Sequence, residues 1–203
     1  MSVSVEVPST EPAGRYRWVL LFGVWLVYFA FGLTQVAMAP LVGVIKIDLG
    51  LSDGAMGLIL GAWPLVYIAS AMPCGAFLDR VGPRKALFVA AAILAFSAAA
   101  RGFANDQLSL FLAVASFGIG GPLISIGAPK LVSLWFEGPD RGLAMGIYIT
   151  GPALGGISAL ALTNSVAMPL LDSDWRQVLF LYAAIALAIG LVWLALNQHP
   201  SAR

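Results

Sequence analysis

Charged side chains are scarce in this sequence. Only 10% of its 203 residues are Asp, Glu, Lys or Arg, whereas 60% are hydrophobic, and the mean hydropathy is +0.91. Because an ordinary soluble domain is about a quarter charged, this composition excludes a water-soluble globular protein. A membrane-spanning helix needs roughly 20 mostly apolar residues. The chain length therefore accommodates six such helices with short connections and leaves no room for a separate soluble domain.

Histidine and cysteine are almost absent as well. The single histidine, His199, lies in the C-terminal tail without other ligand residues around it, so no metal site is expected. The single cysteine, Cys74, cannot form an internal disulfide. A formal net charge of +1 provides no basic surface for nucleic acid. Since we also find no nucleophile–base pair, phosphate-binding loop or redox motif, the sequence predicts neither an enzyme nor a cofactor.

Long apolar runs, separated by short polar segments, predict an all-α membrane protein with six transmembrane helices. The predicted spans are residues 18–43, 54–78, 85–103, 108–134, 142–168 and 177–196. Residues 1–17 are expected to form a disordered cytoplasmic tail, 18–197 the transmembrane domain and 198–203 a second cytoplasmic tail. Because the connections are short, neighbouring helices must pack closely.

Lysine and arginine are distributed unevenly between the two sets of connections. With both termini in the cytoplasm, eight of them lie on the cytoplasmic side and three, Lys46, Arg101 and Arg176, on the outer side. Cytoplasmic loops carry an excess of positive charge, so both termini are predicted to be cytoplasmic. Amphipathic indole rings favour the membrane boundary, and four tryptophans lie near the predicted boundaries: Trp18, Trp135, Trp175 and Trp193.

The segment after the second predicted span is rich in glycine and charge. Residues 75–85 read GAFLDRVGPRK. Gly82 can adopt a turn conformation that a Cβ would penalise, and Asp79 can bind a neighbouring arginine or a helix N-terminus. A plain positively charged cytoplasmic loop explains the same residues equally well on physical grounds.

This segment resembles the signature GxLaDRxGrrk of the major facilitator superfamily, which lies between the second and third helices. Phe77 and Pro83 are mild departures from it. The resemblance implies the N-terminal six-helix half-bundle of such a transporter, organised as a three-plus-three inverted repeat. It also implies a gating role for the loop, with Asp79 and Arg80 controlling the switch between conformations rather than binding solute. The gating motif comprises Gly75, Asp79, Arg80, Gly82, Arg84 and Lys85.

The fifth predicted span contains many glycines. Glycines four residues apart allow helix backbones to approach closely, and Pro152 removes one backbone hydrogen bond and bends the helix. Ordinary packing of membrane helices explains the same pattern. The GPxxGG core at 151–156 resembles the fifth-helix motif associated with antiporters of the same superfamily. The packing motif comprises Gly146, Gly151, Pro152, Gly155 and Gly156.

The fourth predicted span matches the family less closely. Gly118 and Gly120 fit its GxG pattern, but Val114 occupies a position where the family often has an arginine linked to proton coupling. The resemblance therefore argues against proton coupling in this half. Lys130, near the cytoplasmic end, either extends toward the lipid headgroups or attracts anions at the mouth of the cavity. The prolines of this span and Arg101 give a faint resemblance to the cyanate and nitrate/nitrite branch.

Polar side chains inside spans are candidates for a solute pathway, since exposing them to lipid is costly. In major facilitators, helices 1, 2, 4 and 5 line the central cavity. An alternative explanation is that the hydroxyl groups bond their own helices and the aromatic rings fill space. The resemblance assigns eight candidates to the pathway: Tyr28, Thr34, Gln35, Trp63, Tyr67, Ser125, Tyr148 and Thr150.

The resemblance predicts a carrier of a small solute that works by alternating access in the bacterial inner membrane. Its expected partners are the lipid bilayer, a small-molecule solute and a second six-helix half. That half would come from a homodimer, from a separately encoded chain or from a missing C-terminal half. The alternatives are a non-transporting membrane scaffold or accessory subunit, and an inactive truncated N-terminal half.

Overall fold

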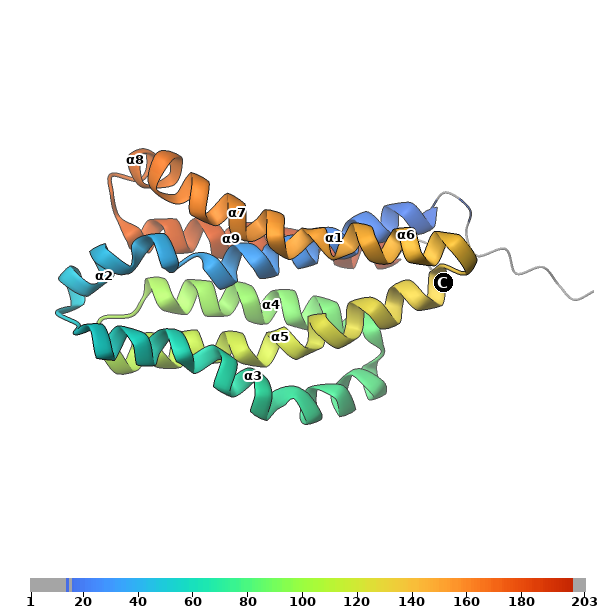
Figure 1. The fold of residues 1–203 in the computed structure, drawn as a ribbon, viewed down its shortest axis with the longest axis horizontal. Helices are drawn as coiled ribbons and strands as arrows, with labels where there is room; N and C mark the ends of the chain where they lie inside the picture. The colour runs from blue at the N-terminus through green and yellow to red at the C-terminus, as the bar shows by residue number, and fades with distance from the viewer. Residues whose placement is uncertain (1–13, 15, 199–203) are drawn as a thin grey trace, which may run out of the picture.

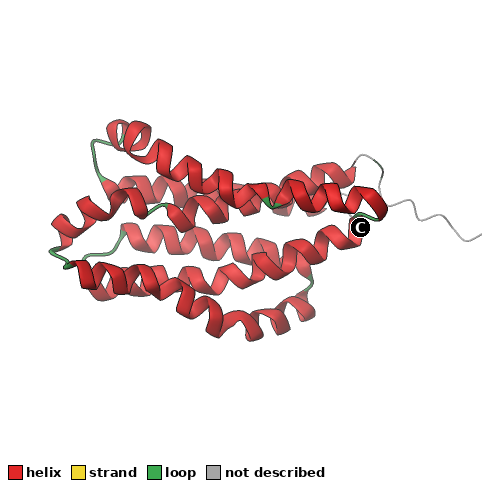
Figure 2. Cartoon of the chain, in the orientation of Figure 1, coloured by secondary structure: helices red, strands yellow, loops and turns green. Residues whose placement is uncertain are grey.

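A computed structural model describes residues 14 and 16–198 of the chain. Within these residues six helical stretches are long and apolar enough to cross a membrane, and no strand is present. The helices run side by side along one long axis (Figure 1), and most loops lie at its two ends (Figure 2). The elements are α1 (Tyr16–Val36), η1 (Ala39–Leu41), α2 (Val42–Leu49), α3 (Asp53–Val81), α4 (Pro83–Gly102), α5 (Gln107–Trp135), α6 (Gly138–Tyr148), α7 (Thr150–Leu162), η2 (Thr163–Ala167), α8 (Met168–Leu170) and α9 (Trp175–Gln198).

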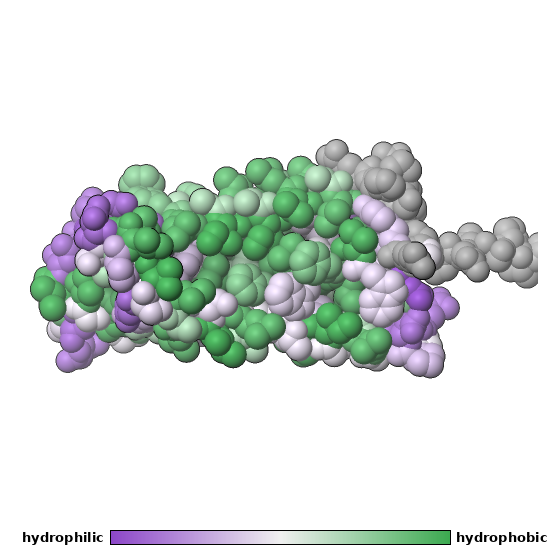
Figure 3. Space-filling model, turned by 90° about the horizontal axis from the view of Figure 1, so that it is seen from above, coloured by the Kyte–Doolittle hydropathy of each residue, from purple (hydrophilic) through white to green (hydrophobic). Residues whose placement is uncertain are grey.

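Both ends of the bundle are hydrophilic (Figure 3). We call the near end the one that contains the start of α1 and the α3–α4 and α5–α6 connections. The far end contains the α2–α3, α4–α5 and α8–α9 connections. Hydrophilic residues gather at both ends, and an apolar belt lies between them (Figure 3). The near end is the one predicted to face the cytoplasm, and this orientation stays a prediction.

The first span is longer than predicted. It was expected to end at residue 43, but helix continues through Lys46 to Leu49, so that the membrane-length segment is Tyr16–Leu49. It is broken between Val36 and Val42, because Pro40 has no N–H to donate to an α-helical backbone. Gly50 then ends α2 in the left-handed conformation, with φ of 61°.

Local sequence signals set the other helix ends. Gly82, with φ of +81°, separates α3 from α4, and Pro83 begins α4, where a missing N–H costs nothing. The Asp106 carboxylate accepts a hydrogen bond from the Ser109 backbone N–H at 2.7 Å and caps α5. The fifth span is interrupted at Ile149, close to Pro152, and contains a π-helical turn at η2.

The helix contacts follow the expected inverted repeat. The second span, α3, packs on the fourth, α5, while the fifth, α7, packs on the first, α1. If spans 1–3 are exchanged with spans 4–6, the pair of spans 2 and 4 becomes the pair of spans 5 and 1. The third span, α4, packs on the sixth, α9, and this pair is exchanged with itself. Such a contact pattern is typical of two three-helix repeats related by a pseudo-two-fold axis.

Trp193 and the two chain ends differ from the sequence-based expectation or lie outside the described residues. Trp193 was placed at a membrane boundary, but it is fully buried, and its indole N–H donates to the Arg84 carbonyl at 3.0 Å. This tryptophan thus joins α9 to the start of α4 instead of anchoring the bundle in the headgroup region. The disordered tails predicted for 1–17 and 198–203 lie almost entirely outside the described residues, and α1 already begins at Tyr16.

Candidate functional site

Six aromatic side chains meet inside the apolar belt. We call them the aromatic cluster: Tyr28, Phe31, Trp63, Tyr67, Phe117 and Tyr148. They come from α1, α3, α5 and α6, which belong to the first, second, fourth and fifth spans. The ring centroids of Phe31 and Phe117 are 5.2 Å apart, those of Trp63 and Phe117 5.6 Å, and those of Tyr28 and Tyr148 5.2 Å. Such spacings are typical of favourable ring contacts, so the cluster joins all four spans.

Glycines of α5 bring the rings together. A Cβ on Gly118 would overlap the Trp63 carbonyl oxygen and would lie 2.8 Å from the Tyr67 backbone nitrogen. A Cβ on Gly121 would lie 2.5 Å from the Tyr67 ring. Since only glycine permits this approach, α3 and α5 touch through their backbones, and the two aromatic rings of α3 reach the cluster.

The structure brings four of the eight pathway candidates into this cluster: Tyr28, Trp63, Tyr67 and Tyr148. Tyr28 and Tyr148 are buried, whereas Trp63 and Tyr67 are partly exposed. Phe31 and Phe117 were missed, because an apolar aromatic residue in an apolar span carries no polar signal in the sequence. None of the contacts tests whether a solute binds there, so the pathway assignment stays a prediction.

The other four candidates are arranged differently. Thr34 is fully buried, and its hydroxyl donates to the Ala30 carbonyl at 2.7 Å, so the hydroxyl is not accessible to a solute in this conformation. Ser125 donates to the carbonyl of Gly121 in its own helix at 3.1 Å. Thr150 is exposed and accepts a hydrogen bond from Trp25 at 2.9 Å.

Gln35 differs from these three candidates. It is partly exposed, lies on the same face of α1 as Tyr28 and Phe31, and its amide makes no hydrogen bond to any other described residue. An amide that is exposed and unpaired can both donate to and accept from a solute.

Arg101 is a charged residue that the pathway candidates did not include. Its side chain leaves the end of α4 and is 2% exposed. One guanidinium nitrogen, Nη1, donates to the Thr34 carbonyl at 2.9 Å, and Cζ lies 5.3 Å from the Phe117 ring centroid. The Nε–H has no hydrogen-bond partner among the described residues. Arg101 therefore lies between α1 and α5, directly behind the aromatic cluster.

The predicted gating motif lies at the near end. Asp79 accepts a hydrogen bond from Lys130 Nζ at 2.7 Å, which joins the ends of α3 and α5. Arg80 and Lys85 are exposed, and the Arg84 guanidinium lies over the Trp135 ring at 5.3 Å. The sequence predicted headgroup contact or anion attraction for Lys130 and not this ion pair, since nothing in a span pattern links residues so far apart in the chain.

An ion pair at the far end occupies the position in the second repeat that the contact between Arg84 and Trp135 occupies in the first. Arg176, the second residue of α9, donates to Asp48 at 2.6 Å near the end of α2. Likewise Arg84, the second residue of α4, contacts Trp135 at the end of α5. Each third helix of a repeat thus binds the first span of the other repeat through a first-turn arginine, as the inverted repeat requires.

The glycines of the fifth span divide into two groups. A Cβ on Gly151 would lie 2.9 Å from the Trp25 carbonyl oxygen, and one on Gly155 would overlap that of Phe29. Gly156 faces the Val36 side chain, and the Pro152 backbone fits against Gly32. Gly146, by contrast, is exposed with open space around it, and so is not a packing position within this chain. Gly75 of the gating motif also has no close neighbour.

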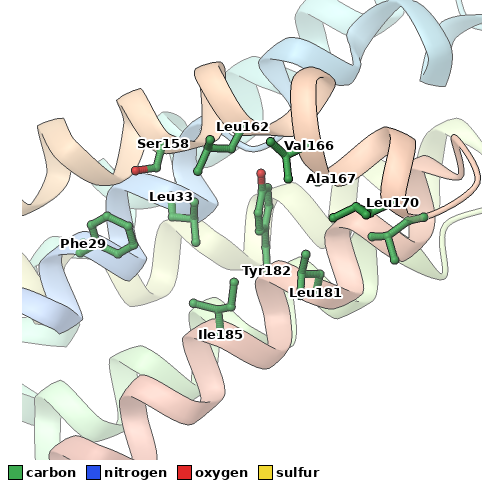
Figure 4. A pocket seen from close by; sticks show the side chains of 11 residues that line it. Phe29, Leu33, Ser158, Leu162, Val166, Ala167, Leu170, Leu181, Tyr182 and Ile185 are labelled. Atoms are coloured by element: carbon green, nitrogen blue, oxygen red, sulfur yellow. The ribbon is translucent and has the colours of Figure 1, made fainter.

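A groove of about 440 Å³ lies between α7 and α9, with α1 at its base. Figure 4 shows the apolar side chains that line it, with the Tyr182 hydroxyl directed toward the fifth span. That hydroxyl is 2.6 Å from the hydroxyl of Thr163 in η2. None of the eight pathway candidates lines this groove. Within the described residues, no three His, Cys, Asp or Glu side chains come together as metal ligands.

Residues 20–203 match the sequence model of the Major Facilitator Superfamily. The chain belongs to the major facilitator superfamily. It is therefore a multi-pass integral membrane protein of a family that transports solutes and is not enzymatic. A bacterial homologue of the human lysosomal transporter Spinster, in an inward-facing and unoccupied conformation, has the same fold, with a TM-score of 0.80 and 19% identity over 92% of this chain and 44% of its own.

Several curated transporters are similar in sequence. A D-galactonate transporter of Escherichia coli O6:H1 is 26% identical over 98% of this chain and 45% of its own length. A probable sulfoacetate transporter of Cupriavidus necator is 27% identical over 88% of this chain and 41% of its own length. A hexuronate transporter of Bacillus subtilis is 30% identical, with coverages of 75% and 34%. The chain spans less than half the length of these relatives, and they do not support the resemblance to the cyanate branch.

Proposed function

We propose that this chain is one six-helix half of an inner-membrane transporter that carries a small organic anion by alternating access. The observation that carries the proposal is the aromatic cluster, which the first, second, fourth and fifth spans build together and which leaves Trp63 and Tyr67 partly exposed. Substrate sites of this kind of transporter lie near the middle of the membrane. The three curated relatives are named for carboxylates or a sulfonate, which supports an anionic solute.

A second six-helix half would complete the pathway. The chain covers 45% of the length of the D-galactonate transporter, and α3 is mostly exposed along its length. A second copy of the chain, a separately encoded partner and a continuation of the same gene product would each supply helices to cover this surface. Chemical cross-linking, together with the DNA sequence beyond the codon for Arg203, distinguishes these three sources.

The ion pair between Asp79 and Lys130 would act at the gate. Both side chains are substantially exposed, at 69% and 46%, so water screens their attraction and the pair contributes at most about 1 kcal/mol to stability. A weak contact at the end of two pathway helices is suited to breaking and re-forming during transport. We therefore expect it to affect flux much more than folding.

Uptake of radiolabelled D-galactonate into proteoliposomes tests the proposal. Asp79→Asn and Lys130→Gln should each lower the uptake rate while the unfolding free energy changes by no more than about 1 kcal/mol. The exchange Asp79→Lys with Lys130→Asp should recover part of the rate. Full uptake with the pair broken would contradict the gating role. A verified dimer that takes up no solute would overturn transport by this chain alone, and retained partner binding without flux would favour a scaffold.

A further inference from the structure

Arg101 is the one residue of the described chain whose charge is fully buried among the transmembrane helices. No carboxylate of the described residues contacts it: its partners are the Thr34 carbonyl and the face of Phe117. Burying a charge without a counter-ion is costly, and a charged group inside a membrane domain usually marks a functional pathway. The unpaired Nε–H adds to this cost.

Part of the cost is offset by the broken first span. Thr34 lies in the last turn of α1, where carbonyl groups lack helical N–H partners, and a cation is favourable at a helix C-terminus. This contact explains where the guanidinium is held. It leaves the positive charge uncompensated, since a carbonyl is a dipole and carries no net charge.

Gln35 connects this buried charge to the exposed face of the bundle. The carbonyl that Arg101 binds belongs to the peptide bond between Thr34 and Gln35. The Gln35 side chain is partly exposed, lies one helical turn along α1 from Phe31 of the aromatic cluster, and has no hydrogen-bond partner among the described residues. A hydrogen-bond donor therefore follows directly, in the chain, the residue whose carbonyl holds an uncompensated cation, at the margin of the candidate pathway.

We propose that Gln35 and Arg101 form an anion site at the far-end side of the aromatic cluster, in which the Gln35 amide binds a carboxylate or sulfonate and the buried Arg101 supplies the charge that selects anions over neutral solutes. Arg101 is a specificity-determining residue in this site and does not touch the solute. The proposal deepens the proposed transport function and rests on it for the identity of the solute.

The expected selectivity follows from the charge separation. A carboxylate bound at the Gln35 amide would lie on the order of 10 Å from the guanidinium. At the effective dielectric constant of about 20 that suits such sites, one charge at this distance changes anion binding by about tenfold. Loss of the Arg101 charge should therefore weaken anion binding about tenfold and leave neutral solutes unaffected.

Thiol labelling tests the charge without requiring transport. Gln35→Cys in a Cys74→Ala background would be reacted with a sulfonate-bearing and an ammonium-bearing methanethiosulfonate, and the ratio of the two rates measured. Arg101→Gln should lower the preference for the anionic reagent at least about tenfold. Arg101→Lys should retain this preference at a pH low enough to keep the lysine protonated. Lys46→Gln is the matched control. It also removes a positive charge, and Lys46 lies in the same span as Gln35, but Lys46 is paired with Asp53 at the surface.

An unchanged ratio in folded Arg101→Gln protein would overturn the proposal. If that variant does not fold, Arg101→Lys provides the test. A buried lysine can lose its proton whereas arginine cannot, so the anion preference of the Arg101→Lys protein should fall as pH rises. A labelling ratio that is constant with pH in this variant would count against the site.

Binding of D-galactonate and of neutral D-galactose to the purified chain in nanodiscs then tests the solute. Arg101→Gln should weaken D-galactonate binding about tenfold, and an equal affinity in wild type and variant would refute the role of Arg101. A charge-dependent labelling ratio without any D-galactonate binding would support the site and overturn the proposed substrate class.

Discussion

Replacing Gly155 by alanine is the sharpest test of how the fifth span packs. The added Cβ would overlap the Phe29 carbonyl oxygen and lie 2.8 Å from the backbone nitrogen of Leu33. Both atoms belong to the backbone of α1, which cannot rotate away as a side chain does. The two helices would have to separate along a contact that otherwise extends from Gly151 to Gly156.

Two opposing contributions set the change in stability that Gly155→Ala causes. Adding a methylene group to a tight contact costs about 1 to 3 kcal/mol. Replacing glycine by alanine within a helix returns up to about 1 kcal/mol. Gly146, in the preceding helix of the same span, has nothing within 4 Å of its added Cβ, so Gly146→Ala should show only this gain. Because this gain is common to both variants, they should differ by the overpacking cost of about 1 to 3 kcal/mol, with Gly155→Ala the less stable.

Thermal unfolding followed by intrinsic tryptophan fluorescence measures the difference. For a chain of this size each kcal/mol corresponds to about 2 to 4 °C, so Gly155→Ala should unfold at least about 2 °C below Gly146→Ala. Equal midpoints would show that α1 and α7 do not touch through their backbones, and the reasoning from the glycine pattern would fail.

Two further predictions concern single contacts. Tyr182→Phe removes the buried hydrogen bond to Thr163 and should lower the free energy of unfolding by about 0.5 to 1.5 kcal/mol. Adding Thr163→Val to this variant should lower it little further. If the effects of the two substitutions, measured by chemical denaturation, were strictly additive, this bond would be refuted. The backbone N–H of Ser109, followed by its hydroxyl, lowers the pKa of the Asp106 carboxyl. The ionised cap therefore stabilises the folded chain above the ordinary pKa of about 3.9 and is lost as pH falls through the lower folded-state value. Asparagine in Asp106→Asn can still cap the helix but does not titrate, so the loss of stability at acidic pH should be smaller in this variant. An unchanged loss of stability at acidic pH would refute the role of the Asp106 carboxylate.

Some features of the site could be anticipated from sequence and others could not. Tyr28, Trp63, Tyr67 and Tyr148 combine aromatic rings with a polar group, which marked them as candidates, and the structure brings them together. Phe31 and Phe117 complete the same cluster but resemble every other apolar residue of the spans. Thr34 and Gln35 are both polar residues inside an apolar span, so the sequence treats them alike. Only the fold shows that the Thr34 hydroxyl donates to a carbonyl of its own helix.

The number of spans, their approximate limits and the family could be predicted from the sequence, because apolar length, Gly82 with Pro83, and the charged loop are local properties of the chain. Tertiary structure decided which side of each helix faces its neighbours. A membrane helix is apolar toward lipid and toward protein alike, so hydrophobic periodicity does not distinguish the two faces. For that reason the pairing of Asp79 with Lys130 and the position of Arg101 behind Phe117 became visible only in the folded bundle.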